Sequence, residues 1–277
     1  MRPMPYPDAM RAAMTQRQRG FTLIEAIMVI TITGILAGVV AIFIRTPVQS
    51  YFDVERRAEM TDTVDTALRR IGRDVRLALP NSVRVTKVGT VSYLEFLQTS
   101  DGGRYRADGP GDILDFTATD TTFDVLGPPV AMVAGAQNLL VVYNLGIPGA
   151  DAYQGDNTSP ITAIDAATHI VTINAKQFPL SSPGNRFQII SSPVTYACDP
   201  GTGNLTRFWN YPIQGAQPTA FAGTPQALLA TNVAGCTFTY DQLVINQRTS
   251  VVSIWLQLSQ GSENVNLYHE VHVSNVP

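Results

Sequence analysis

The chain of 277 residues is poor in the side chains that most enzymes and metal proteins use at their sites. It has only two cysteines, and its three histidines are His169, His269 and His272. His269 and His272 stand three positions apart in a predicted strand, so we expect them on opposite faces. Two distant cysteines without nearby histidines lack the ligand set of a zinc site. We therefore predict no catalytic site and no bound metal.

The chain also lacks a basic surface and a nucleotide-binding loop. Lys and Arg number 19 against 22 Asp and Glu, so the formal net charge is −3 and nucleic-acid binding is not predicted. Gly201-Thr202-Gly203 lacks the third glycine and the following helix of a nucleotide fingerprint, and no cofactor is expected. Calcium binding stays an alternative for one glycine-rich loop, although its acidic residues match no EF-hand. These residues are Asp101, Asp108, Asp112 and Asp115.

What the sequence does have is one long apolar run near its N-terminus. Between Phe21 and Ile44 the only charged residue is Glu25, and Arg45 ends the run. A run of about 18 or more apolar residues is typical of a membrane-spanning helix. A carboxylate inside such a helix is costly unless it has a partner, which makes Glu25 a candidate functional residue. Basic residues before the run predict a cytoplasmic N-terminus. They are Arg2, Arg11, Arg17 and Arg19.

The start of the run carries a specific motif. Arg19-Gly20-Phe21-Thr22-Leu23-Ile24-Glu25, behind a short basic leader, resembles the processing site of type IV prepilins and pseudopilins. In that family a membrane-embedded aspartyl peptidase, the prepilin peptidase, cuts between the glycine and the phenylalanine and then N-methylates the new amino terminus. The resemblance implies cleavage between Gly20 and Phe21 and methylation of Phe21. It also implies that Glu25 pairs with the amine of a neighbouring subunit during filament assembly.

The N-terminal apolar run has two alternative interpretations, a secretory signal peptide and an ordinary single-pass anchor. A secretory signal peptide is cut after its apolar stretch at small residues, and Ala37, Gly38 and Ala41 are small. The run is longer than a usual signal peptide, however, and a helical pattern continues beyond Arg45. An ordinary single-pass anchor explains the length but leaves Glu25 without a partner.

Gly34 and Gly38 form a GxxxG step within the run. Such a step lets membrane helices approach closely, and pilin-like filaments pack their N-terminal helices into a central bundle. Glycine is also simply common in membrane helices, and we give the two explanations equal weight.

A helix is predicted to continue to Leu79. Apolar or small residues recur in steps of three and four, and charged residues occupy the other side. Pro47 is expected to interrupt or kink this helix, and Pro80 is expected to end it. The apolar face consists of Val54, Ala58, Thr61, Val64, Leu68, Ile71, Val75 and Leu79.

After Pro80 the pattern changes to short β-like runs separated by glycine and proline. The fold class predicted is α+β, with a long N-terminal transmembrane helix that continues into an extracytoplasmic domain of antiparallel β-sheet. The expected segments are a cleaved leader (1–20), a membrane helix (21–44), its amphipathic continuation (45–79) and a β-rich domain (80–277). Strands are predicted at 93–97, 139–143, 186–190, 194–198, 236–240, 251–258 and 265–273. Loops are predicted at 101–112, 146–160 and 210–226.

The two cysteines, Cys198 and Cys236, both fall in the part expected outside the cytoplasm. An even count in an oxidising compartment predicts one disulfide, and two separate buried thiols are the alternative. Close by, Phe208, Trp209 and Tyr211 form an aromatic cluster that suits either a subunit interface or core packing.

The rest of the chain narrows the resemblance. Residues 69–85 resemble the helix end of the J-type minor pseudopilins of type II secretion, and Val194-x-Tyr196 followed by Leu205-x-Arg207 resembles their hairpin. Together with Tyr93-Leu94-Glu95-Phe96 and Gly103-Arg104-Tyr105-Arg106, the pattern is most similar to the MshO family of MSHA-type pilus systems.

This resemblance implies a minor subunit of the inner membrane, with its C-terminal domain in the periplasm, that later enters a pilus or pseudopilus at initiation or at the tip. Its implied partners are prepilin peptidase, other major and minor pilin-like subunits and the inner-membrane assembly platform. The alternatives are a type II secretion pseudopilin and, from a different class, an anchored periplasmic enzyme, binding protein or adhesin.

Overall fold

The computed structural model describes residues 20–240 and 249–277. The basic residues of the predicted leader lie outside this range. The chain divides into two compact units after Asp53, and each unit is described by itself. The predicted fold class is confirmed, because one long apolar N-terminal helix is followed by antiparallel sheets.

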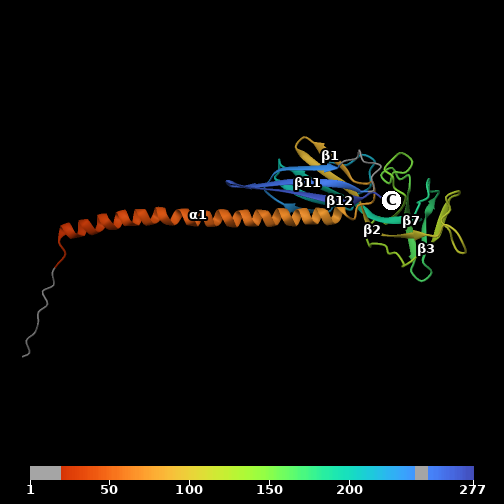
Figure 1. The fold of residues 1–277 in the computed structure, drawn as a ribbon, viewed down its shortest axis with the longest axis horizontal. Coiled ribbons are helices and arrows are strands. Elements are labelled where there is room, and N and C mark those ends of the chain that lie inside the picture. Colours follow the sequence, from red (N-terminus) through yellow and green to blue (C-terminus); the bar gives the residue numbers. More distant parts are fainter. Residues whose placement is uncertain (1–19, 241–248) are drawn as a thin grey trace, which may run out of the picture. The chain divides into compact units, whose positions relative to one another are not determined.

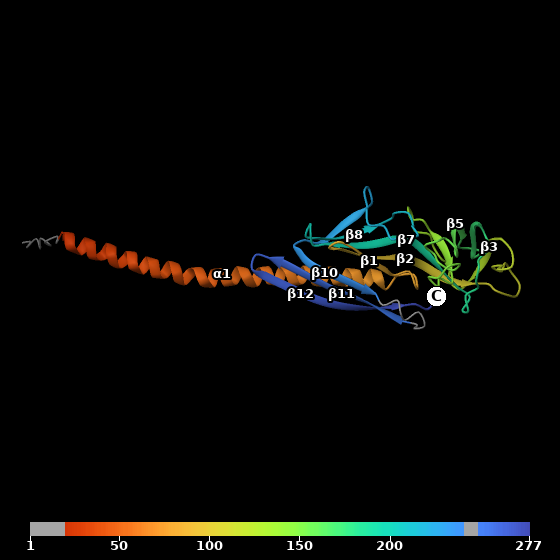
Figure 2. The ribbon, with the colours of Figure 1, turned by 90° about the horizontal axis from the view of Figure 1, so that it is seen from above.

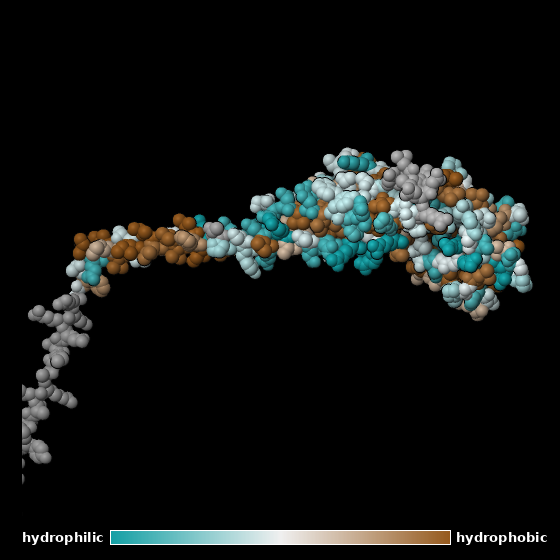
Figure 3. All heavy atoms as spheres, viewed as in Figure 1, coloured by the Kyte–Doolittle hydropathy of each residue, from teal (hydrophilic) through white to brown (hydrophobic). Residues whose placement is uncertain are grey.

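The first unit contains the beginning of helix α1, which runs from Leu23 to Val75. Large apolar side chains are exposed along this part, among them Phe21, Ile24 and Phe43. Figure 3 shows these apolar residues as a continuous brown stretch of the helix. The interruption expected at Pro47 does not occur, since the helix continues through this residue.

The end of α1 lies four residues before the predicted end at Leu79. After Val75 the chain tightens into turns, with the Leu77 amide donating to the Asp74 carbonyl at 3.0 Å. The Leu79 amide then donates to the carbonyl of Leu97 in a neighbouring strand at 2.8 Å. This bond to the sheet replaces the bond that a further helical turn would supply.

The second unit consists of the rest of α1 and two antiparallel sheets (Figure 1). The first sheet has nine strands in the order β1-β2-β3-β6-β5-β4-β7-β8-β9, and the second has three in the order β10-β11-β12. The strands of the first sheet are β1 (Arg84–Val88), β2 (Val91–Tyr105), β3 (Asp120–Leu126), β4 (Leu139–Val142), β5 (Thr158–Asp165), β6 (Ile170–Lys176), β7 (Arg186–Asp199), β8 (Asn204–Trp209) and β9 (Gln226–Ala230). Those of the second are β10 (Val233–Tyr240), β11 (Thr249–Gln260) and β12 (Glu263–Ser274).

Six strands of the first sheet form a closed ring, because β2 also pairs with β7. The ring runs β2-β3-β6-β5-β4-β7 and returns to β2. Its interior is filled by a separate hydrophobic cluster that includes Tyr105, Phe123 and Phe187. Within the second unit, both ribbon views place β3 beyond the C-terminal end of α1, whereas parts of β2 and β7 pack against the helix (Figures 1 and 2).

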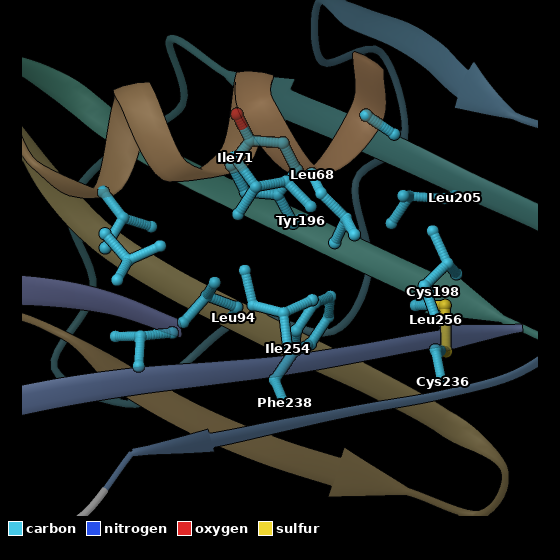
Figure 4. Close-up of a cluster of buried hydrophobic side chains, with 14 of the residues drawn as sticks. Leu68, Ile71, Leu94, Tyr196, Cys198, Leu205, Cys236, Phe238, Ile254 and Leu256 are labelled. Atoms are coloured by element: carbon cyan, nitrogen blue, oxygen red, sulfur yellow. A yellow bond between two sulfur atoms is a disulfide. The ribbon is translucent and has the colours of Figure 1, made fainter. Parts of the chain in front are cut away.

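The largest core lies where α1 packs against both sheets. Leu68 and Ile71 of α1 meet Leu94 of β2 and Ile254 of β11 in one buried cluster (Figure 4). Of the predicted helix face, Val64, Leu68, Ile71 and Val75 are buried, whereas Val54 remains 68 % exposed. The buried core residues of α1 begin at Met60, so Val54 and Ala58 at the start of the predicted face lie outside the core.

Every strand predicted from the sequence is present, although two of them belong to one element. Residues 186–190 and 194–198 both lie in β7. The loop predicted at 101–112 is partly wrong, since Asp101 to Tyr105 continue β2 along β7. Glycine is required for this close pairing. A Cβ on Gly102 would lie 2.9 Å from the Phe187 carbonyl oxygen, which is too close for a side chain.

Candidate functional site

The predicted processing site lies just ahead of α1. Gly20, Phe21 and Thr22 are not helical, and all three are exposed. A Cβ placed on Gly20 would meet nothing within 4 Å. The peptide bond between Gly20 and Phe21 is therefore in an open, non-helical segment, where a peptidase can reach its backbone.

Thr22 fixes where the helix begins. Its hydroxyl accepts a hydrogen bond from the Glu25 amide at 3.3 Å, and its carbonyl accepts one from the Ala26 amide at 3.1 Å. This is the geometry of an N-cap residue, and Thr22-x-x-Glu25 is the sequence pattern of a capping box. That signal is visible in the sequence but was not used in the prediction.

Glu25 is exposed in the first turn of α1. The helix dipole favours a negative charge at this end by up to about 1 kcal/mol at exposed positions. In lipid an unpaired acidic side chain costs about 2.5–3.5 kcal/mol, so the dipole alone does not offset the cost. If Glu25 lies in lipid, its carboxylate therefore calls for a cationic partner.

Gly34 and Gly38 form a strip of the helix surface that carries no side chain. This strip is open, since a Cβ on either residue would meet nothing within 4 Å. Nine positions separate Glu25 from Gly34, and at roughly 100° per residue the two point in opposite directions. The Thr31 hydroxyl is paired within the helix, because it donates to the Ile27 carbonyl at 2.9 Å. The helix thus has a polar contact point and a close-approach strip on opposite sides.

In the second unit, Cys198 of β7 and Cys236 of β10 form a disulfide. This confirms the predicted pairing. The bond joins the nine-stranded sheet to the three-stranded sheet at one edge of the largest core (Figure 4).

A buried charge cluster ties α1 to the nine-stranded sheet. Asp74 is only 3 % exposed, and its carboxylate accepts hydrogen bonds from the Tyr196 hydroxyl at 2.7 Å and from Arg207 Nε at 2.8 Å. Arg70 adds an ion pair at 3.2 Å. Burial and the neighbouring Asp74 raise the pKa of Tyr196, so its hydroxyl stays a donor. The sequence prediction missed Asp74, because Tyr196 and Arg207 lie more than a hundred positions away from it.

A second buried cluster lies on the face of β2 that is turned away from α1. Glu95 accepts hydrogen bonds from Arg84 Nε at 2.8 Å and from the Tyr211 hydroxyl at 3.1 Å. Arg84 also stacks over the ring of Tyr153 at 3.6 Å. Burial raises the pKa of Glu95, while Arg84 and Tyr211 oppose that rise. Burial and Glu95 likewise raise the pKa of Tyr211.

Two of the four residues considered for metal binding, Asp101 and Asp115, are engaged otherwise. Asp101 accepts hydrogen bonds from the amides of Gly102 and Ala131 at 2.7 and 2.8 Å. Asp115 accepts from the amide and hydroxyl of Thr117. Within residues 20–240 and 249–277, no group of three or more His, Cys, Asp or Glu side chains is placed to hold a metal ion.

The predicted aromatic cluster divides between the two faces of the sheet. Trp209 packs against the largest core, and Arg207 lies 4.9 Å from its ring. Phe208 and Tyr211 instead meet at Phe221, which the prediction did not include. His269 and His272 lie on opposite faces of β12, as predicted, with His269 against Gly72 of α1.

The comparisons with known proteins bear on the N-terminal end. The family model for the prokaryotic N-terminal methylation motif matches residues 15–41, which include Gly20, Phe21 and Glu25. No curated protein and no solved structure gives a significant match. The motif indicates a type IV pilin-like or pseudopilin substrate of prepilin peptidase that associates with other pilin subunits.

The same motif points to a structural subunit rather than an enzyme. By length and composition, α1 is apolar enough to cross a membrane. The motif and this helix together indicate a single-pass membrane anchor.

Proposed function

We propose that this chain is a minor subunit of an MSHA-type pilus system, similar to the MshO family, that acts in filament initiation or at the tip. The observation that carries the proposal is the methylation motif at 15–41, placed on a long apolar helix whose first turn holds Glu25. Prepilin peptidase removes residues 1–20 and methylates Phe21. The processed subunit stays in the inner membrane through its helix, with the β-rich domain in the periplasm, until the assembly platform moves the subunit into a filament.

Two features of α1 support assembly by helix contact. Removal of the leader creates an amine at Phe21, which is the cation that Glu25 of a neighbouring subunit needs in a medium of low dielectric constant. Gly34 and Gly38 let another helix approach the opposite side of α1 closely. A helix with contacts on two sides suits the interior of a bundle.

The minor role is supported by the second unit. Tyr196 and Arg207, from the motif that resembles the pseudopilin hairpin, meet at Asp74 of α1 and lock the helix to the sheet. The six-stranded ring adds bulk beyond the end of α1. We infer that this bulk discourages repeated stacking along a filament shaft and favours the tip.

The proposal is tested by deleting the gene in the native host and restoring it in trans. We expect fewer surface filaments after deletion, and we expect quantitative mass spectrometry to find the chain in sheared filaments at far fewer copies than the major subunit. Loss of protein secretion with filaments intact would favour a type II secretion pseudopilin instead. Unchanged filaments and unchanged secretion would contradict both assignments and leave an anchored periplasmic protein.

A further inference from the structure

A pocket of about 330 Å³ lies on the face of the nine-stranded sheet that is turned away from α1. Its floor comes from β2, β7 and β8, whose opposite side chains, such as Leu94 and Leu205, enter the largest core. One wall comes from residues 210–225, here called the strap, which contribute Thr219 and Phe221. The volume is at the lower end of what small-molecule sites provide, which is roughly 300–1,000 Å³.

Aromatic rings form one side of the pocket. Phe221 of the strap stacks on Phe208 of β8 with ring centroids 4.4 Å apart and an angle of 13°. Tyr93 of β2 lies 6.3 Å from the Phe221 ring, and Tyr211 contacts Phe221 from the other direction at 5.4 Å. Phe221 is therefore held by three other rings, although it is only half-buried.

Apart from Val91 and Ala197, the remaining lining is polar, and it carries no cation. Thr206, Asn204 and Asp199 supply a hydroxyl, an amide and a carboxylate, and none of the lining residues is Lys, Arg or His. Asp199 accepts from the Gly201 amide and the Thr202 hydroxyl, and its four lone-pair sites leave room for further donors. A lining with one negative charge and no positive charge disfavours phosphate, sulfate and carboxylate ligands.

The pocket is built before any ligand arrives. Arg84 holds the strap through the carbonyls of Gly215 and Gln214 at 2.7 and 2.9 Å. The Tyr93 hydroxyl donates to the Thr219 carbonyl at 3.2 Å. Because these bonds fix the strap independently of a ligand, binding requires little ordering of the chain.

We propose that this pocket binds a short neutral saccharide. A sugar ring presents C–H faces, which suit the flat rings of Phe221 and Tyr93, and hydroxyl groups around its edge, which suit Thr206, Asn204 and Asp199. Aromatic surface combined with uncharged or acidic hydrogen-bonding groups meets both needs, whereas a purely apolar ligand leaves the polar lining unpaired. This inference stands on the second unit alone and does not depend on processing or on filament assembly.

The test uses the full-length protein in a zwitterionic detergent, because detergents with sugar headgroups would occupy the pocket. The protein is applied to an array that carries neutral, sialylated and sulfated oligosaccharides, and the strongest neutral binder is then titrated by calorimetry. We expect binding to neutral saccharides. The variant Phe221→Ala should weaken it at least about tenfold, since it removes a stacking wall. Thr206→Val, which keeps the shape and removes the hydroxyl, should weaken it about three- to tenfold.

Tyr268→Ala is the matched control, because Tyr268 is an aromatic residue of β12 that is 61 % exposed and does not line the pocket. The affinity of Tyr268→Ala for the neutral saccharide should equal that of the unmodified protein. If Phe221→Ala fails to fold, as judged by its thermal unfolding midpoint, Thr206→Val alone decides the matter. The proposal is overturned by an array without neutral binders, by binding to acidic saccharides only, or by neutral binding that is unchanged in the folded variants.

Discussion

At the scale of single residues, what could be predicted depended on where the partners lie. Glu25 stood out because it is the only charge in an apolar run, which is a property of the local sequence. Asp74 did not, since it looks like one charge among many in a charged helix, and Glu95 did not, since nothing in the strand around it indicates a partner. Their roles come from burial beside Arg207 and Arg84, and only the fold brings those pairs together.

The proposed role of Glu25 leads to a prediction about assembly. Glu25→Gln removes the charge but keeps the length of the side chain, so the amine of a neighbouring subunit loses its counter-ion. We expect the leader to be removed normally and the mature chain to be absent from sheared filaments. Glu59→Gln, at an exposed position of α1 in the second unit, should enter filaments as the unmodified chain does. Normal incorporation of Glu25→Gln would rule out the proposed pairing.

The cluster around Asp74 leads to a prediction about stability. Asp74→Ala leaves Arg207 buried without its carboxylate, and breaking a buried pair from one side costs about 3–5 kcal/mol. Asp65→Ala breaks the exposed pair with Arg69 and should change the free energy of unfolding by about 0.5 kcal/mol or less. Denaturant unfolding in micelles, followed by tryptophan fluorescence, measures both. Equal effects of the two substitutions would show that the cluster does not anchor the helix.

Glu95 leads to a prediction about pH. Its pKa in the folded chain is raised by burial above the ordinary value of 4.5. A raised pKa means that the stability contributed by protonated Glu95 is fully present below pH 4.5 and is lost as the pH rises through the folded-state pKa. The free energy of unfolding should therefore fall, relative to the non-titrating variant Glu95→Gln, as the pH rises above 4.5 and through the folded-state pKa. A change in the opposite direction would mean that Arg84 outweighs burial.

At the scale of elements, the long helix and the alternating strands were predictable from hydrophobic periodicity. The strands β1, β3, β5, β6 and β9 were not predicted, and β8 was implied only by the resemblance to the pseudopilin hairpin, which its pairing with β7 matches. The partners of these strands stabilise them more than their own sequence patterns do. β7 was predicted as two strands, at 186–190 and 194–198, but it is one strand. Its pairing with β4 ends at Ile190 of β7 and its pairing with β8 begins at Val194 of β7. Pro193 falls between the two, so its missing N–H breaks no pairing on this side.

The disulfide between β7 and β10 leads to a prediction at this scale. The double variant Cys198→Ser/Cys236→Ser opens a loop of 38 positions, and the chain-entropy model gives a loss of about 4 kcal/mol. Denaturant unfolding should give the same loss for the unmodified protein under reducing conditions. If the double variant is as stable as the oxidised protein, the link between the two sheets contributes nothing to stability.

At the scale of the whole molecule, the fold class followed from the order of one helix and many strands, but the ring did not. Its closure needs β2 to pair with β7 about ninety positions later, and no local pattern specifies such a partner. The pocket under the strap escaped prediction for the same reason, since Tyr93 lies more than a hundred positions before Phe208 and Phe221. The N-terminal motif was recognisable because its residues are consecutive.

The most direct test of the account is the intact mass and the N-terminal peptide of the membrane-extracted chain, expressed with and without prepilin peptidase. The account predicts a chain that begins at N-methylated Phe21 only when the peptidase is present. A chain that keeps residues 1–20 in the presence of an active peptidase would leave Glu25 without an amine to meet. A cut beyond Ala41 would remove α1 from the membrane and would likewise contradict the filament mechanism.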